Sequence, residues 1–228
     1  NPDVNIRLRE IRWNGHVAGE IYRVGFPSIV MQSIGSVMVF GMNKILFGFT
    51  KTATAVFGAY FKLQSFIFMP VFGLNNGMVP IVAYNFGAGR MDRVKKTVKL
   101  AVCTAVAIMA VGLAIFQLAP ELLLSFFDAS EEMLAIGVPA LRIISVSFLP
   151  ATIGFILPTM FQSMGQGGYS LAVFLLRQLV ITLPAAAILS GPFGLTGIWA
   201  SFILAESIAA GVALLFYHKL RKTDPVLE

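Results

Sequence analysis

The hydrophobic residues of this chain are gathered into about six stretches, each long enough to cross a lipid bilayer as a helix. A hydrocarbon core about 30 Å thick requires roughly 20 apolar residues in helical form, and soluble domains do not repeat that length so often. The stretches cover approximately residues 24–48, 54–86, 94–118, 133–164, 169–189 and 195–217. The pattern predicts an all-α integral membrane protein with a six-transmembrane-helix bundle.

The polar positions divide the chain into three parts. Residues 1–23 mix arginines with apolar residues, which indicates a basic amphipathic linker at the headgroup boundary. Residues 24–218 form the bundle, and residues 219–228 form a tail. Because the chain starts at Asn1 rather than Met, we expect it to be part of a longer protein. The second and fourth stretches exceed the bilayer thickness, so we expect tilts or kinks at Pro70, Pro80, Pro139, Pro150 and Pro158.

The loops between the stretches alternate in charge. Residues 1–23, 90–99 and 219–228 are rich in Lys and Arg, whereas the loop after the third stretch carries Glu121, Asp128, Glu131 and Glu132. Basic loops stay on the cytoplasmic side of a membrane. With six crossings, the pattern predicts a multi-pass protein with both termini in the cytoplasm.

Composition supports a lipid environment and excludes several classes of protein. The chain is 57% hydrophobic and 12% charged, with a mean hydropathy of +0.81. A net charge of +6 would indicate nucleic-acid binding in a soluble chain, but here the basic residues lie at the ends of the stretches, so we expect no nucleic-acid partner. The single cysteine, Cys103, cannot form an internal disulfide.

Catalytic and metal-binding motifs are absent from the sequence. It contains no GxxxxGK[ST] motif for nucleotide phosphates, and residues 87–90 lack the third glycine of a dinucleotide-binding motif. His16 and His218 lie at opposite ends, without Cys, Asp or Glu at metal-ligand spacing. No Ser has a His and a carboxylate at its membrane depth, as a hydrolase triad requires. We therefore expect neither an enzyme nor a metal site or organic cofactor.

Polar residues recur inside the first two stretches at the same helical spacing of i, i+4 and i+11, which puts each set on one helix face. The sets are Gln32, Ser36 and Asn43 in the first stretch, and Gln64, Phe68 and Asn75 in the second. Asn76 adjoins the second set and lies inside a GxxxG motif at residues 73–77. Pro70 and Pro80 flank this motif, so we expect local unwinding or a hinge there. Two interpretations stay open: the faces line a shared cavity, or the amides bond between helices.

Three charged residues lie deep within the stretches. Arg177 and Glu206 lie at depths of about 12 and 17 Å, counted at 1.5 Å per residue from the cytoplasmic side, and we expect them to form a buried pair. The pair could be a fixed structural contact, or it could handle protons or substrate. Lys62 lies on the second stretch, where we expect it to face a water-filled cavity. Phe68, Met69, Phe72 and Met160 are candidates for an aromatic wall that holds flat organic cations.

At these residues the sequence resembles the multidrug and toxic compound extrusion (MATE) family, over about residues 15–220. The similar motifs are Gly25-Phe26-Pro27 with Gln32, Ser36 and Asn43; Phe68-Met69-Pro70 with Gly73-Leu74, Gly77 and Pro80; Asn85-Phe86-Gly87-Ala88-Gly89-Arg90; Pro139; and Phe161-Gln162-Ser163-Met164-Gly165. The order and spacing of these motifs indicate the family more specifically than any single motif does.

The resemblance implies one half of a twelve-helix transporter, in which two six-helix bundles enclose a cavity that opens alternately to each side. This chain is similar to the C-terminal half, so the expected partner is an N-terminal half. The implied activity is export of organic cations or drugs from a bacterium, across its inner membrane, in exchange for protons or sodium. The implied cavity residues are Gln32, Ser36, Asn43, Gln64, Phe68, Asn75, Asn76 and Gln162.

Two other functions remain open. A sister family moves lipid-linked oligosaccharides, but its cavities commonly contain several Arg or Lys residues for pyrophosphate, and here only Lys62 and Arg177 are deep. The chain could instead be a non-transporting membrane scaffold or a half-size unit that forms homodimers.

Overall fold

The computed structural model describes residues 14–223, apart from the side chains of residues 20, 21, 23–25, 27, 28, 31, 32 and 221–223. This part of the chain is helical and contains no β-strand. The elements are α1 (Gly15–Phe47), α2 (Lys51–Gly87), α3 (Met91–Leu118), α4 (Pro120–Ser125), α5 (Glu131–Ser145), α6 (Phe148–Ser163), α7 (Gly167–Leu175), the π-helix η2 (Leu176–Ile181) and α8 (Thr182–Thr223).

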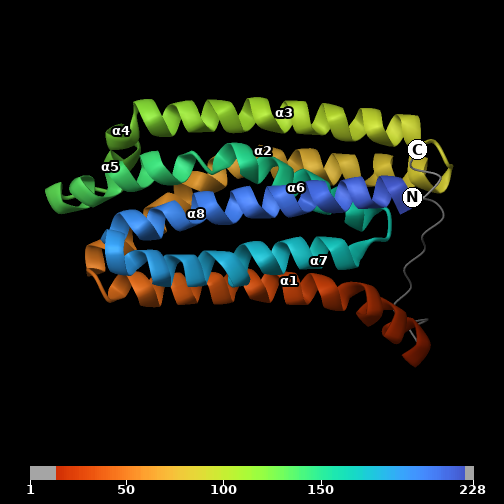
Figure 1. Cartoon of the computed structure of the whole chain (residues 1–228), viewed down its shortest axis with the longest axis horizontal. Helices are drawn as coiled ribbons and strands as arrows, with labels where there is room; N and C mark the ends of the chain where they lie inside the picture. Colours follow the sequence, from red (N-terminus) through yellow and green to blue (C-terminus); the bar gives the residue numbers. More distant parts are fainter. Residues whose placement is uncertain (1–13, 224–228) are drawn as a thin grey trace, which may run out of the picture.

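The long helices lie side by side in one bundle, as Figure 1 shows. The start of α1, the start of α3 and the end of α8 lie at the same end of this bundle. Helix α6 packs against α2, α3, α7 and α8 and therefore occupies a central position. The predicted all-α bundle is confirmed.

The helices suited to spanning a membrane match the predicted stretches. By length and composition they are α2, α3 and the continuous helical segment Gly167–Leu220. Helices α5 and α6 together give a further candidate, bent by 50°. The apolar part of α1 among the residues searched, Ser33–Phe47, is shorter.

Segment Gly167–Leu220 makes two passes because α8 turns back on itself (Figure 1). The turn lies at Gly194, whose φ of 56° favours glycine. Gly197 is also required there, because a Cβ at this position would collide with the carbonyl oxygen of Leu189. The two arms of α8 correspond to the end of the fifth predicted stretch and to the sixth.

The kink expected in the fourth stretch lies between α5 and α6. Pro150 has no N–H and cannot donate to the carbonyl of Val146, which interrupts the helical ladder at this point. The side-chain amide of Gln117 donates to the carbonyl of Arg142 at 2.7 Å and contacts the hydroxyl of Ser145 at 3.1 Å. A residue of α3 therefore stabilises the exposed end of α5.

One other local expectation, unwinding at residues 73–77, is wrong, while the boundaries of the linker and the tail stay a prediction. Helix α2 runs without a break through Pro70 and Pro80, so residues 73–77 are not unwound. Helix α1 begins at Gly15, where the side chain of Asn14 accepts hydrogen bonds from the N–H groups of His16 and Val17. Residues 15–23, assigned above to a linker, thus belong to α1, while residues 1–13 lie outside the described part. At the other end, α8 continues beyond residue 218 to Thr223.

Candidate substrate-binding site

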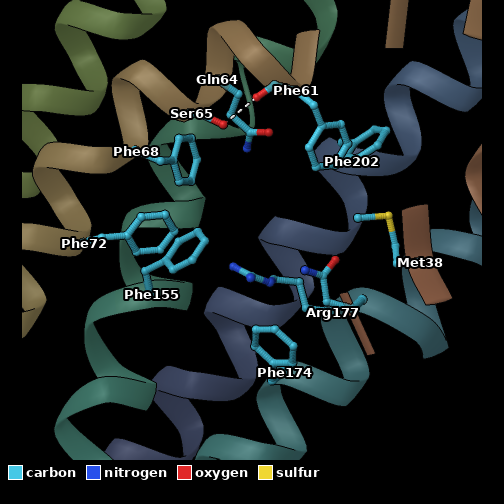
Figure 2. Close-up of a pocket in the computed structure, with 11 residues that line it drawn as sticks. Met38, Phe61, Gln64, Ser65, Phe68, Phe72, Phe155, Phe174, Arg177 and Phe202 are labelled. Atoms are coloured by element: carbon cyan, nitrogen blue, oxygen red, sulfur yellow. Dashed lines mark hydrogen bonds between the residues drawn. The ribbon is translucent and has the colours of Figure 1, made fainter. Parts of the chain in front are cut away.

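A hollow of about 320 Å³ opens between helices from both ends of the chain. Figure 2 shows the side chains that surround it, and six of the 11 are phenylalanines. They come from α1, α2, α6, α7, η2 and the second arm of α8: Met38, Phe61, Gln64, Ser65, Phe68, Phe72, Phe155, Phe174, Arg177, Gln178 and Phe202. We call this space the aromatic hollow.

Three phenylalanines of the aromatic hollow, Phe68, Phe72 and Phe155, contact one another, and two of their three contacts are edge to face. The ring of Phe155 lies 5.2 Å from that of Phe68 and 5.6 Å from that of Phe72, between ring centres, with the planes nearly perpendicular. Such pairs are favourable arrangements for aromatic quadrupoles. The remaining ring surfaces offer flat, electron-rich faces to the space between the helices.

The predicted ion pair adjoins the aromatic hollow: Arg177 lines it, whereas Glu206 lies behind Arg177 and is not a lining residue. The Nη1 atom of Arg177 lies 3.4 Å from Oε2 of Glu206, and the two side chains are only 4% and 17% exposed. The guanidinium of Arg177 also lies 4.1 Å from the ring centre of Phe155 and 5.4 Å from that of Phe174. In Figure 2 this guanidinium points toward the rings of Phe72 and Phe155. A carboxylate and two aromatic faces therefore surround one buried cation.

A π-helical turn carries Arg177. Segment η2 follows α7 directly and continues into α8, so the helix contains a wider turn within one pass. The hydroxyl of Thr182 donates to the carbonyl of Arg177 at 2.6 Å, five residues earlier, which is the spacing of the π-helical turn. Pro184 follows and has no N–H to complete a regular ladder. The sequence analysis did not identify this turn.

Gly154 of α6 lies beside the ion pair. A Cβ at this position would lie 3.4 Å from Oε2 of Glu206 and 3.9 Å from Nη1 of Arg177. These are ordinary van der Waals distances, so α6 lies directly beside both charged groups at Gly154, and a side chain larger than that of alanine would extend toward them. No sequence motif indicated this contact.

A second, wider hollow of about 590 Å³ adjoins the first. Met38, Phe61 and Gln178 line both spaces, so the two are continuous along α1 and α2. Ser36 and Asn43 of α1 line this polar hollow, as we name it, while Gln64 and Phe68 of α2 line the aromatic hollow. The predicted polar face of α1 thus lines the polar hollow, and the predicted face of α2 lines the neighbouring aromatic hollow. The side chain of Gln32 lies outside the described residues.

Several predicted cavity residues lie elsewhere. Asn75 is 7% exposed and its Oδ1 has no hydrogen-bond partner, but it lines neither hollow. Asn76 and Gln162 are exposed outside both hollows. Lys62 lines neither hollow, because residue 62 lies about 200° around α2 from Gln64; its Nζ lies 5.9 Å from the ring centre of Phe127, and its place in a water-filled cavity stays a prediction.

The predicted aromatic wall is half right. Phe68 and Phe72 line the aromatic hollow, but Met69 is 65% exposed on another face of α2, and Met160 is buried in the core. Sequence reasoning missed Met38, Phe61, Ser65, Phe155, Phe174, Gln178 and Phe202 as lining residues. For two of them a signal existed, because Phe174, Arg177 and Gln178 have the i, i+3, i+4 spacing of one helix face.

Comparison with known families assigns the chain to one of them. The MatE family model matches residues 27–188, which is more than half of the chain. The chain belongs to the MatE family. It is 32% identical over 218 residues to the multidrug export protein MepA of Staphylococcus saprophyticus, and that alignment covers 96% of the chain and 48% of the relative. A MepA of Staphylococcus aureus is 30% identical over 224 residues, covering 97% and 49%.

Solved structures show the same fold. An outward-facing multidrug-resistance MATE transporter of the MOP superfamily aligns with a TM-score of 0.84 at 24% identity, covering 96% of this chain and 51% of that one. An inward-facing form aligns equally well, with a TM-score of 0.84 over 97% and 52% of the two chains. The MatE chain described here therefore spans about half the length of the relatives it matches.

Proposed function

We propose that this chain forms the C-terminal six-helix half of an ion-coupled exporter of organic cations and drugs, which works by alternating access. The half-length match to proteins named multidrug export protein supports this proposal. The structural likeness extends to transporters in outward-facing and inward-facing conformations. An N-terminal half of the same protein is the proposed partner, and proton or sodium is the proposed coupling ion.

The aromatic hollow is the observation that carries the proposal. Flat, weakly hydrated cations bind to aromatic faces, and a nearby carboxylate that is only partly exposed increases their affinity further. Glu206 is such a carboxylate, and it is reached from the hollow through Arg177, whose guanidinium lines the hollow and lies against Phe155. A bound organic cation would compete with Arg177 for these groups. Substrate and coupling ion would then drive the cycle through different affinities for the two orientations.

A lipid-linked oligosaccharide is the alternative substrate. Its pyrophosphate would require several basic side chains, as phosphate recognition generally does. Among the residues that line the aromatic and polar hollows, Arg177 is the basic one, and Glu206 neutralises it. These hollows therefore lack the group of basic side chains that a pyrophosphate requires, which is evidence against the lipid-linked substrate.

A half-size homodimer or a non-transporting scaffold is the alternative from another class. The intact mass of the native product separates them from a full transporter. A mass near 24.7 kDa supports a half-size unit, and about twice that value supports a longer protein that contains this chain.

Transport by the complete gene product tests the proposal. We expect everted membrane vesicles to accumulate ethidium under an imposed proton gradient or a sodium gradient, and the effective gradient identifies the coupling ion. Phe155→Ala should weaken the apparent affinity for ethidium by about 2- to 10-fold, since an aromatic contact contributes about 0.5–1.5 kcal/mol. Phe66→Ala is the matched control, because Phe66 is 73% exposed and lines neither hollow. Absence of uptake under both gradients, with folded protein in the vesicles, would contradict the proposal.

A further inference from the structure

A third concave surface lies on the opposite side of α6 from the aromatic hollow. It is a groove of about 210 Å³ between α3, α6 and the second arm of α8. On α6 it is lined by Ile153 and Leu157, which stand about 200° around the helix from Phe155. The groove is therefore separate from the proposed substrate site. Its lining consists of Lys95, Val98, Lys99, Val102, Cys103, Ile153, Leu157, Leu214 and Tyr217.

The groove is polar at one end and apolar at the other. Lys95 and Lys99 lie in the first turns of α3, and Tyr217 lies near the end of α8, at the same end of the bundle (Figure 1). Counted at 1.5 Å per residue, Lys99 lies about 12 Å from the start of α3 and Tyr217 about 9 Å from the end of α8. Val102, Leu157 and Leu214 continue the groove toward the middle of the membrane.

We propose that this groove binds an anionic phospholipid, with the headgroup phosphate at Lys99 and Lys95 and one acyl chain along the apolar side chains. The order of charge and apolar surface along the groove matches the order of headgroup and chain in a lipid. Basic pockets between transmembrane helices on the cytoplasmic side bind acidic headgroups in this way. The hydroxyl of Tyr217 provides a further polar group at headgroup depth.

Two lysines on neighbouring turns allow a matched pair of variants. Lys95 also interacts with another group of the chain, so Lys99 is the better position for a test. Lys96 is exposed on the same helix but does not line the groove. Each lysine near an anionic lipid surface contributes about 1 kcal/mol, so Lys99→Gln should weaken apparent affinity for the lipid about fivefold. Lys96→Gln makes the same change in net charge but should leave the apparent affinity for the lipid unchanged.

Cys103 supplies a direct reporter of groove occupancy. It is exposed and lines the apolar part of the groove. The experiment uses the complete gene product in mild detergent. Any cysteine other than Cys103 is replaced by serine, so that Cys103 is the single reactive thiol. The rate of Cys103 modification by a maleimide is measured while dioleoylphosphatidylglycerol is added. We expect this lipid to slow the reaction and raise the apparent Tm, with the titration midpoint shifted about fivefold in Lys99→Gln.

Four results would overturn the proposal. Equal protection by dioleoylphosphatidylcholine would show lipid contact without headgroup recognition. Equal protection by glycerol phosphate would show a site for a free anion instead of a lipid. A Cys103 that does not react even without added lipid would show that protein covers the groove. Equal shifts for Lys99→Gln and Lys96→Gln would show general surface charge instead of a site.

Discussion

The buried ion pair predicts an asymmetry between its two partners. In Glu206→Met, the guanidinium of Arg177 stays charged, because arginine does not lose its proton in proteins. Its side chain is 4% exposed, and its Nε has no hydrogen-bond partner. In Arg177→Met, the carboxyl of Glu206 remains but can take up a proton and become neutral. We therefore expect Glu206→Met to destabilise the protein more than Arg177→Met.

The expected loss follows from the geometry. At the observed 3.4 Å and an effective dielectric constant of 20, Coulomb attraction is about 5 kcal/mol. The cost of removing both groups from water offsets much of this in the intact pair, so the pair itself adds little net stability. Removal of one partner leaves that cost uncompensated, typically about 3–5 kcal/mol. Because the Glu206 side chain is 17% exposed, we expect the lower end, about 3 kcal/mol for Glu206→Met.

The assay is unfolding of the complete gene product by SDS in mixed micelles, followed by far-UV circular dichroism. Wild type, both single variants and the double variant are compared, and the double variant should regain most of the loss because it leaves no buried charge. Glu132→Met serves as the control, because Glu132 is an exposed carboxylate at the start of α5. Purely additive losses in the double variant, or equal losses in both single variants, would refute the reasoning.

Two further substitutions test local geometry in the same assay. Gly197→Ala should cost at least about 2 kcal/mol because its Cβ meets backbone, whereas Gly211→Ala, with open space around its Cβ, should be neutral or stabilising. Equal effects of these two would contradict the tight turn in α8. Thr182→Val should cost about 1 kcal/mol through loss of the hydrogen bond to the carbonyl of Arg177, and Thr182→Ser should retain it. A loss in Thr182→Ser as large as in Thr182→Val would assign the effect to packing instead.

Features that depend on distance along a helix could be predicted from the sequence. The contact between Arg177 and Glu206 followed from counting depth at a fixed rise per residue, together with the cost of an unpaired charge in lipid. A kink in the fourth stretch was expected at Pro139, Pro150 and Pro158; it lies at Pro150, which removes one donor from the ladder, whereas Pro139 and Pro158 lie within α5 and α6. Asn14 is also a residue type that commonly caps the start of a helix, but residues 1–23 were assigned to a linker instead.

Features that depend on how helices are rotated against each other could not be predicted. Gln64 and Asn75 share a face of α2, yet one lines the aromatic hollow and the other is buried elsewhere, because neighbouring helices cover different lengths of that face. Nothing in the sequence distinguishes Phe155 and Phe202, which line the aromatic hollow, from phenylalanines such as Phe148 that are buried in the core. Beyond residue 176 the regular helical period itself fails, since η2 is π-helical.

The π-helical turn also has a consequence for changes in chain length. A π-turn is an α-helix that accommodates one additional residue, so deletion of a single residue within Leu176–Ile181 would return the segment to a regular α-helix. The faces of α7 and α8 would keep their orientations, whereas a deletion elsewhere in the pass would rotate all later residues by about 100°. This segment is thus a position where the family can gain or lose one residue inside a membrane-spanning helix. Sequence alignments of relatives should accept a one-residue gap here, although gaps within such helices are ordinarily penalised.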